Sequence, residues 1–302
     1  MNHNIDLTAL PRGKIEELKN IGYHYCSDVE ANLQNLRQVL GTDWEDLAKV
    51  SKFANALEIF QKEALNGCIL SYNKELDKLL ENVIRPETVT EFTGHSGSGK
   101  SQVCFQLCVS VQLPKWCGGM GGQALYISTN KNFNSQRLKE LARKFQRDCN
   151  LLKSRSEENE FDLTEESIME NIYYIDVTSG DDLLSCIFLL DNYLEGKNIR
   201  LLVVDSITQP LKTMEIKVRL GLINKLFQQL RILASQFDLA VILTNDLTTR
   251  VNERESIIAS SFGDSFYHMV NSRIIFSKND ATFHGRLLKS ISNVQVEADF
   301  YL

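Results

Sequence analysis

The segment Gly94–Ser101, which reads GHSGSGKS, constrains the fold of this chain more than any other. It matches the pattern G-x-x-x-x-G-K-[S/T] in full, and it lies between an apolar run and an amphipathic segment. In that setting the glycines let main-chain N–H groups close around phosphate groups, and the helix that follows adds its positive dipole end. The segment therefore predicts a phosphate loop inside a strand–loop–helix unit.

Each residue of this loop has an expected role in holding a nucleotide. Lys100 is expected to reach the β- and γ-phosphates and to act catalytically, and the Ser101 hydroxyl is expected to ligate Mg²⁺. A loop of this kind that binds nothing is the alternative, and the intact Lys100 and Ser101 argue against it. ATP and Mg²⁺ are thus the expected cofactors. The expected cofactor-binding residues are Gly94, His95, Ser96, Gly97, Ser98, Gly99, Lys100, Ser101 and Gln102.

A second acidic position completes the expected site. Four apolar residues at 201–204 are followed by Asp205, which places a carboxylate at the carboxyl end of a buried strand. Ligands of open α/β sheets bind at that edge, so Asp205 is predicted to hold the Mg²⁺ hydration shell. The alternative is that Asp205 caps a helix beginning near Ser206.

Short apolar runs alternate with amphipathic segments from residue 88 onward. This alternation predicts an α/β fold with a mainly parallel sheet and helices on both faces. Further short strands at 272–277, 285–290 and 294–300 are expected to extend the sheet in antiparallel fashion. The expected strands are 88–92, 124–128, 172–176, 200–205 and 239–244, and the expected helices are 100–112, 134–147, 181–194 and 216–237.

The pattern of the first 66 residues predicts a separate, small helical domain. Residues 67–302 are expected to form the core domain, with a connector at its start. Helices are expected at 12–21, 26–39 and within 43–65, with Gly22 as a left-handed cap. The connector spans about residues 66–86, and the polar segment 150–170 is expected to form a surface loop or short helix. A length of 302 residues agrees with about two domains.

Composition excludes several classes of protein. There is no apolar run long enough to cross a membrane and no secretory signal, so no membrane partner is expected. Seven cysteines without a C-x-x-C pair favour a reducing compartment, and Cys104 and Cys108 are expected to be core residues on one helix face. The net charge of −6 argues against a protein that coats nucleic acid by bulk charge.

Beyond the phosphate loop, several blocks resemble the ATPase core of eukaryotic RecA-type recombinases over about residues 67–300, and residues 8–65 resemble the family's N-terminal helical domain more loosely. The resemblance implies a RecA-like P-loop ATPase core preceded by a small helical domain. The blocks at 242–249 and 262–268 are most similar to those of the C-type Rad-fifty-one paralogues. The other blocks are 89–94, 100–104, 111–114, 118–122, 124–129, 201–205 and 239–245.

Two positions depart from the family's pattern. Asn130 stands where the family has a glutamate that polarises the attacking water, and an amide cannot accept the water's proton. Slow hydrolysis or nucleotide binding alone is therefore expected, with Asn130 as the catalytic candidate; another carboxylate serving instead is the alternative. Asp246 replaces the family's γ-phosphate-sensing glutamine, and a carboxylate there repels a triphosphate unless a cation intervenes. Coupling of ATP to DNA in the family's manner is thus in doubt.

The resemblance places two loops toward DNA. The first, 208–219, carries Lys212, Lys217 and Arg219, and the second, 248–261, carries Arg250 and Arg254. Residues 212–302 hold 11 basic and 9 acidic residues, so weak contact with phosphates is one interpretation and solvated loops the other. The stretch 53–56 (FANA) has the F-x-x-A form by which recombinases dock on a neighbouring protomer, but it is expected inside a helix and is interpreted as chance.

Taken with the resemblance, these residues predict a nuclear recombinase paralogue that binds ATP, forms hetero-oligomers with other paralogues, and assists homologous-recombination DNA repair. It is expected to support recombinase filaments on single-stranded DNA with weak or absent ATP hydrolysis. The alternatives are an active DNA-dependent ATPase with strand-exchange activity, and a scaffold subunit that uses nucleotide only structurally. Whether the role is mitotic or meiotic stays open.

Overall fold

The computed structural model describes residues 12–25, 28, 55–114, 119–153, 163–212, 214–251, 256–291 and 296–302. The chain divides into two compact units, residues 1–63 and 64–302, and each is described by itself. In the first unit, helix α1 (Arg12–Asn20) occupies the helix predicted at 12–21, and Gly22 follows it with φ +97°. The predicted helix at 26–39 lies, but for residue 28, outside the described residues.

Helix α5 (Ala56–Asn66) crosses the boundary between the units, and the predicted boundary at residue 66 falls at its last residue. The side chain of Asn55 accepts a hydrogen bond from the Glu58 N–H at 3.0 Å, which caps the first turn. The F-x-x-A stretch is therefore divided: Ala56 begins α5 and Asn55 precedes it, while Phe53 and Ala54 lie outside the described residues.

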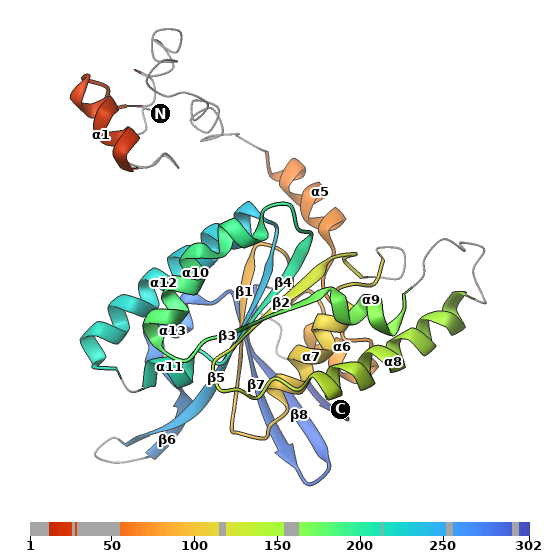
Figure 1. Cartoon of the computed structure of the whole chain (residues 1–302). Coiled ribbons are helices and arrows are strands. Elements are labelled where there is room, and N and C mark those ends of the chain that lie inside the picture. Colours follow the sequence, from red (N-terminus) through yellow and green to blue (C-terminus); the bar gives the residue numbers. More distant parts are fainter. Residues whose placement is uncertain are drawn as a thin grey trace. The chain divides into compact units, whose positions relative to one another are not determined.

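A largely parallel sheet forms the centre of the second unit (Figure 1). Its strand order is β3-β2-β4-β5-β1-β7-β8-β9, with parallel pairing from β3 to β7 and antiparallel pairing of β7 with β8 and of β8 with β9. This confirms both the predicted fold class and the antiparallel addition. The strands are β1 (Thr88–Gly94), β2 (Gln123–Ser128), β3 (Ile172–Asp176), β4 (Ile199–Asp205), β5 (Ala240–Val251), β6 (Ser256–Ser260), β7 (Ser272–Asn279), β8 (Thr282–Lys289) and β9 (Glu297–Phe300).

Helices cover both faces of this sheet, and each face has its own hydrophobic core (Figure 1). Successive residues of β4 point to opposite faces, so Leu201 and Val203 belong to one core and Leu202 and Val204 to the other. The first face is covered by α6 (Lys74–Leu80), α7 (Lys100–Ser110), α8 (Ser135–Lys153) and α9 (Glu165–Glu170), and the second by α10 (Gly180–Leu194), α11 (Thr208–Lys212), α12 (Ile216–Gln236) and α13 (Gly263–Met269).

Both segments predicted as DNA loops contain regular structure. Most of 208–219 belongs to α11 and to the first turns of α12. In 248–261, β5 continues to Val251 and pairs antiparallel with β6, with Thr248 opposite Ala259. The β-branched residues of both strands suit a hairpin, in which each strand satisfies main-chain groups of the other. The description of 248–261 as a loop was therefore wrong, because its cross-strand pairing partner was not recognised.

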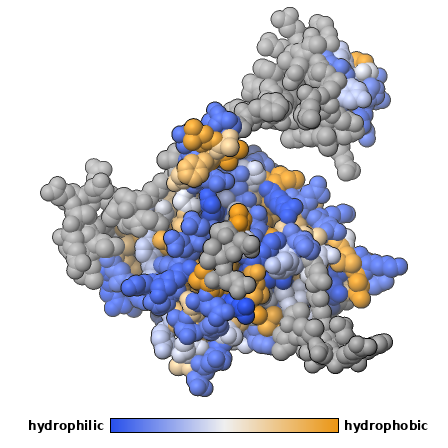
Figure 2. Space-filling view, turned by 180° about the vertical axis from the view of Figure 1, so that it is seen from behind, coloured by the Kyte–Doolittle hydropathy of each residue, from blue (hydrophilic) through white to orange (hydrophobic). Residues whose placement is uncertain are grey.

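One face of the molecule has a mainly hydrophilic surface. From the side opposite to Figure 1, most of the coloured surface is hydrophilic and hydrophobic side chains gather in small groups (Figure 2). Within the described part of the chain, no helix combines the length and apolar character that a membrane crossing needs. Cys104 and Cys108 are fully buried in α7, as predicted, and burial raises the pKa of both thiols.

Candidate nucleotide-binding site

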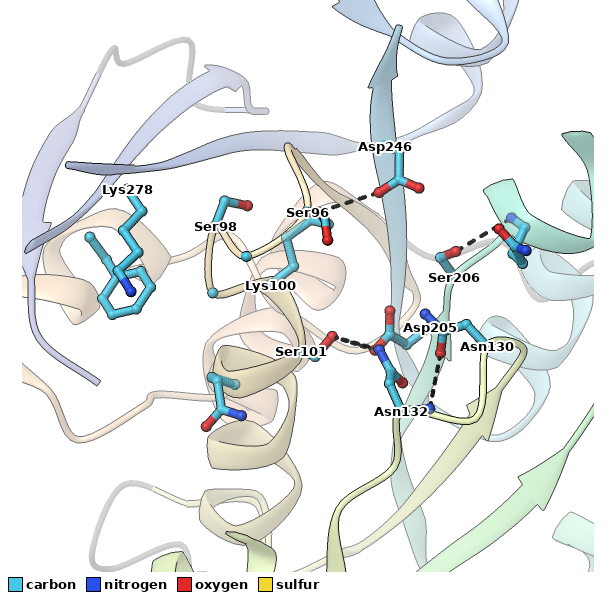
Figure 3. Close-up of a pocket in the computed structure, with 15 residues that line it drawn as sticks. Ser96, Ser98, Lys100, Ser101, Asn130, Asn132, Asp205, Ser206, Asp246 and Lys278 are labelled. Atoms are coloured by element: carbon cyan, nitrogen blue, oxygen red, sulfur yellow. Dashed lines mark hydrogen bonds and ion pairs between the residues drawn. The ribbon is translucent and has the colours of Figure 1, made fainter. Parts of the chain in front are cut away.

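A cavity of about 540 Å³ opens beside the phosphate loop, where strands β1 and β4 end and strand β5 passes with Asp246 (Figure 3). Strand ends of a parallel sheet meet at one edge, so segments far apart in sequence supply its walls. We call it the phosphate cavity. It is lined by Ser96, Gly97, Ser98, Gly99, Lys100, Ser101, Gln102, Asn130, Asn132, Asp205, Ser206, Gln209, Asp246, Lys278 and Phe283.

The loop backbone takes conformations that favour glycine. Gly97 and Gly99 have φ of +80° and +92°, in the left-handed region that side chains rarely adopt. A Cβ atom on Gly99 would meet Phe283 Cδ1 and Leu302 Cδ1 at 2.9 Å, so this glycine also allows the end of the chain to pack against the loop. Helix α7 begins at Lys100, directly after Gly99. The first main-chain N–H groups of this helix therefore point toward the cavity.

Lys100 folds back onto its own loop. Its Nζ donates to the main-chain oxygens of Gly94 at 2.7 Å and of His95 at 3.0 Å, and it lies 3.5 Å from Asp246 Oδ1. The Lys100 side chain is 8% exposed, whereas that of Asp246 is 45% exposed. The charge of the buried ammonium is thus balanced by a carboxylate at the rim of the cavity.

Ser101 and Asp205, both predicted as Mg²⁺ ligands, lie side by side. The Ser101 hydroxyl donates to Asp205 Oδ2 at 2.6 Å (Figure 3). Tyr126 donates to the same oxygen and Thr244 to the other, and both donors are buried. Burial and the Asp205 charge raise the pKa of Tyr126 well above its usual range, so the phenol keeps its proton and its donor role.

This arrangement fits a magnesium ion. Mg²⁺ prefers hard oxygen ligands and is usually held by one or two side chains together with phosphates and water. The Ser101 hydroxyl and the Asp205 carboxylate supply such oxygens at the mouth of the phosphate loop, and Tyr126 and Thr244 fix the carboxylate's orientation. The alternative, in which Asp205 only caps a helix, does not agree with these contacts. Its carboxylate oxygens accept hydrogen bonds from the side chains of Ser101, Tyr126 and Thr244.

Asn130 lies on the far wall of the cavity, after the end of β2. It is exposed, and its side-chain oxygen accepts from the Asn132 N–H at 3.4 Å. The Asn132 amide extends toward Asp205 Oδ2 at 3.5 Å. Gln102, predicted to touch the nucleotide, also lines the cavity and accepts from Arg137 Nε at 2.8 Å. Three side-chain amides and a guanidinium thus surround this end of the site.

A buried ionic network lies behind the cavity, between the strands that carry it. Glu91 in β1 is fully buried and accepts from Arg273 Nε of β7 and from Asn245 Nδ2 of β5 at 2.8 Å. Burial raises the pKa of Glu91, and the Arg273 guanidinium opposes that shift. Arg273 also lies 4.7 Å from the ring centre of Tyr267. This network joins three adjacent strands at the level of the phosphate loop.

Some of the sequence-predicted site residues lie outside the cavity. Gly94 and His95 contribute main-chain oxygens to Lys100, and the His95 side chain is exposed. Of the predicted DNA contacts, Lys212 and Lys217 are exposed at the end of α11 and the start of α12, and Arg219 lies 5.6 Å from the Phe262 ring centre. The side chain of Arg250 and all of Arg254 lie outside the described residues.

Five lining residues were not predicted from the sequence: Asn132, Ser206, Gln209, Lys278 and Phe283. Lys278 and Phe283 come from β7 and β8, which are the antiparallel addition to the sheet, and Lys278 Nζ lies 5.0 Å from the Phe283 ring centre. No motif marks them, because they reach the loop only through the sheet order β1-β7-β8. Asn132 and Gln209 follow strands β2 and β4, and that position after a strand is the signal by which they might have been found.

A second, apolar hollow of about 410 Å³ lies at the β3 edge of the sheet, between β3 and α10. Two large side chains of α10 are strongly exposed there: Leu189 at 53% and Tyr193 at 57%. We call this hollow the β3 groove. It is lined by Leu125, Tyr173, Tyr174, Ile175, Cys186, Leu189, Tyr193, Lys197 and Ile199.

Comparison with known proteins gives consistent matches. A family model described as Rad51 matches residues 67–282. The chain is 31% identical over 281 residues to "DNA repair protein RAD51 homolog 3" of Cricetulus griseus, covering 89% of this chain and 77% of that protein. The Dictyostelium discoideum protein of the same name is 32% identical over 217 residues, with 70% and 57% covered. "DNA repair and recombination protein RadA" of Metallosphaera sedula is 30% identical over 292 residues, with 91% and 85% covered.

Proposed function

Because this chain belongs to the Rad51 family, we propose that it is an ATP-binding recombinase paralogue acting in homologous-recombination DNA repair. In this role it supports recombinase filaments on single-stranded DNA, in the nucleus and together with other paralogues, and hydrolyses ATP slowly or not at all. The observation that carries the proposal is the phosphate loop set directly against the Ser101–Asp205 pair.

Nucleotide binding is supported by how the cavity distributes its groups. The left-handed glycines and the first turn of α7 turn main-chain N–H groups toward a phosphate chain. Ser101 and Asp205 would hold Mg²⁺, which when bound neutralises part of the phosphate charge. Lys100 is within reach of the same region. These residues together supply the donors, the cation site and the positive charge that a nucleoside phosphate needs.

Weak hydrolysis is supported by the side chains around the expected water. Asn130 can orient a water molecule but cannot take its proton. Among the described lining residues the carboxylates are Asp205 and Asp246, and these already contact Ser101 and Lys100. Loss of a positioned base typically lowers a rate by about 10²–10⁴-fold. The cavity is thus better suited to holding a nucleotide than to cleaving it.

Association with other recombinase-family chains is supported by the β3 groove. Strand β3 pairs only with β2 among the described strands, so its other edge presents free main-chain donors and acceptors. The apolar hollow and the exposed Leu189 and Tyr193 lie beside that edge. An extended apolar segment of a second chain would add a strand there and place side chains in the hollow.

Contact with DNA is supported more weakly, by charge alone. Lys212 and Lys217 are exposed on adjoining helices, and they are suited to contacting backbone phosphates. The described parts of the two predicted DNA segments hold no aromatic side chain on which bases would stack. DNA contact is therefore proposed as an addition to the basic surfaces of partner chains.

The test measures ATP binding and turnover with and without single-stranded DNA, for the wild type, Lys100→Ala and the matched surface variant Lys225→Ala. We expect wild-type and Lys225→Ala protein to bind ATP with turnover far below about 1 s⁻¹, a rate within the usual range for enzymes. Lys100→Ala should bind about 10–100-fold more weakly, since hydrogen bonds to charged groups contribute about 1.5–3 kcal/mol. DNA-stimulated turnover near 1 s⁻¹ would instead indicate the active ATPase.

Partner association is tested with the same proteins plus Leu189→Asp in the β3 groove. Leu189→Asp should lose association with a recombinase-family partner while it keeps nucleotide binding. If Lys100→Ala binds the partner as well as the wild type does, the scaffold interpretation, in which nucleotide has no part in assembly, is favoured. Retention of the partner by Leu189→Asp would contradict the proposed docking surface.

A further inference from the structure

We infer that Asp246 makes the phosphate cavity favour a nucleoside diphosphate over a nucleoside triphosphate. The inference rests on the nucleotide site proposed above and adds a selectivity to it. Its basis is the contact between Asp246 and Lys100, in which a carboxylate of the chain itself takes a position beside the lysine that is expected to meet the outermost phosphates (Figure 3).

Lys100 donates two hydrogen bonds to its own loop and forms an ion pair with Asp246. An ammonium group has three N–H donors, and Lys100 Nζ has three oxygen neighbours: Gly94 O at 2.7 Å, His95 O at 3.0 Å and Asp246 Oδ1 at 3.5 Å. The first two are main-chain atoms of the loop. The third is a half-exposed side chain, so a phosphate that approaches Lys100 competes first with Asp246.

The backbone keeps Asp246 in this position. In the parallel register of β1 and β5, Asp246 lies opposite Gly94, where the phosphate loop begins. Its N–H donates to Thr208 Oγ1 at 3.0 Å, and its main-chain oxygen accepts from Ser261 N at 2.9 Å and Ser261 Oγ at 2.8 Å. Main-chain bonds on both sides thus hold the residue while its carboxylate faces Lys100.

The two phosphate chains meet this carboxylate differently. Main-chain N–H groups of a phosphate loop hold the α- and β-phosphates, whereas the lysine reaches the β- and γ-phosphates. A γ-phosphate therefore brings its additional negative charge closest to Asp246, and a diphosphate ends before it. Lys278, the second cation among the described lining residues, lies across the loop from Asp246 in Figure 3. Its charge does not face the carboxylate and does not offset this repulsion.

The test compares the dissociation constants of Mg-ADP and of a slowly hydrolysed Mg-ATP analogue by calorimetry. The wild type should bind the diphosphate at least as tightly as the triphosphate. Asp246→Asn keeps the side chain's shape and removes its charge, and it should strengthen triphosphate binding about tenfold while diphosphate binding changes by less than about threefold. Asp191→Asn on α10, outside the cavity, removes the same charge and should leave both constants unchanged.

Salt separates repulsion from a structural effect. Raising ionic strength from about 0.05 to about 0.5 M screens charge, so the wild-type ratio of triphosphate to diphosphate affinity should rise, and that of Asp246→Asn should rise less. An unchanged ratio in Asp246→Asn, with both nucleotides still bound, overturns this inference and leaves the nucleotide site standing. Failure of the wild type to bind either nucleotide overturns the nucleotide site and this inference with it.

Discussion

The phosphate cavity and the β3 groove lie at different edges of one sheet and are built in opposite ways. In the cavity, polar side chains already contact one another: Ser101, Tyr126 and Thr244 all donate to Asp205, and Lys100 is surrounded by oxygens. In the groove, Leu189 and Tyr193 are exposed by more than half, and strand β3 pairs along only one edge with the strands that the structure describes.

The difference indicates what each region needs from a partner molecule. A cavity whose donors are already engaged binds a ligand by exchange, so its selectivity depends on which internal contact the ligand replaces. Binding to a groove of exposed apolar side chains is driven by burial of that apolar area, and its affinity depends little on charge. Removing single polar groups should therefore affect the cavity side strongly, whereas groove substitutions should leave the isolated chain nearly unchanged.

The largest effect on this contrast is expected from Glu91→Gln, behind the cavity. The substitution leaves the Arg273 guanidinium buried without a counter-charge, which typically costs about 3–5 kcal/mol of unfolding free energy. Chemical denaturation of the wild type and the variant measures this. The double variant Glu91→Gln/Arg273→Met should recover part of the loss. A cost below about 1 kcal/mol would mean that the cavity side does not depend on its buried charges.

A smaller loss is expected from Tyr126→Phe, which removes one hydroxyl from the cavity and little volume. The variant loses a hydrogen bond to the Asp205 carboxylate, and bonds of this kind contribute about 1.5–3 kcal/mol. Chemical denaturation without nucleotide measures the loss in unfolding free energy. Titration with Mg-nucleotide should show weaker binding, because the Asp205 carboxylate is less firmly oriented. Tyr193→Phe, at the exposed β3 groove, is the matched control and should change neither value.

In the groove, Leu189→Asp should alter the unfolding free energy of the isolated chain by no more than about 0.5 kcal/mol. Leu189 is 53% exposed, and substitutions away from the core usually have effects of this size. The same denaturation experiment measures it. A loss of several kcal/mol would show that Leu189 belongs to the core and would remove the contrast between the two regions.

The smallest expected effect is on the reactivity of the Cys186 thiol, which lines the groove. Burial raises its thiol pKa to about 11, so the thiol stays protonated near neutral pH and alkylation should be slow. Because the thiolate is the reactive form, the alkylation rate should rise about tenfold per pH unit between roughly pH 7 and 9. Mass spectrometry of the Cys186 peptide measures this rate. A rate that levels off below pH 9 would contradict the raised pKa.

Much of the fold and part of the site followed from the sequence. The apolar runs at 201–204 and 239–244 predicted buried parallel strands, and the resemblance to the recombinase paralogues was confirmed by the Rad51 match. The phosphate loop, Ser101 and Asp205 were predicted as parts of one site, and the structure brings them together. These features depend on local pattern, since hydrophobic periodicity and glycine-rich loops act over short stretches of chain.

The cavity's other wall could not be predicted in this way. Lys278 and Phe283 reach the loop because β7 pairs with β1, and the pairing of Asp246 with Lys100 depends on the register between β5 and β1. The hairpin of β5 and β6 was described as a loop because nothing in either segment alone identified its pairing partner. Register and strand order are long-range properties, set by how two whole faces pack.

By itself, then, the sequence determined the five parallel strands at 88–92, 124–128, 172–176, 200–205 and 239–244 and the long helices between them. It also determined which residues form a phosphate loop with a carboxylate at a strand end. Only the tertiary structure decided that Lys100 is held by two loop oxygens and by Asp246, and that Tyr126 and Thr244 orient Asp205. It also decided that β3 pairs only with β2 within the described part of the chain. The physical reason is that the spacing of apolar side chains along the chain sets helices and strands locally. Charge balance and hydrogen bonding depend instead on distances between atoms that only the packed sheet brings together.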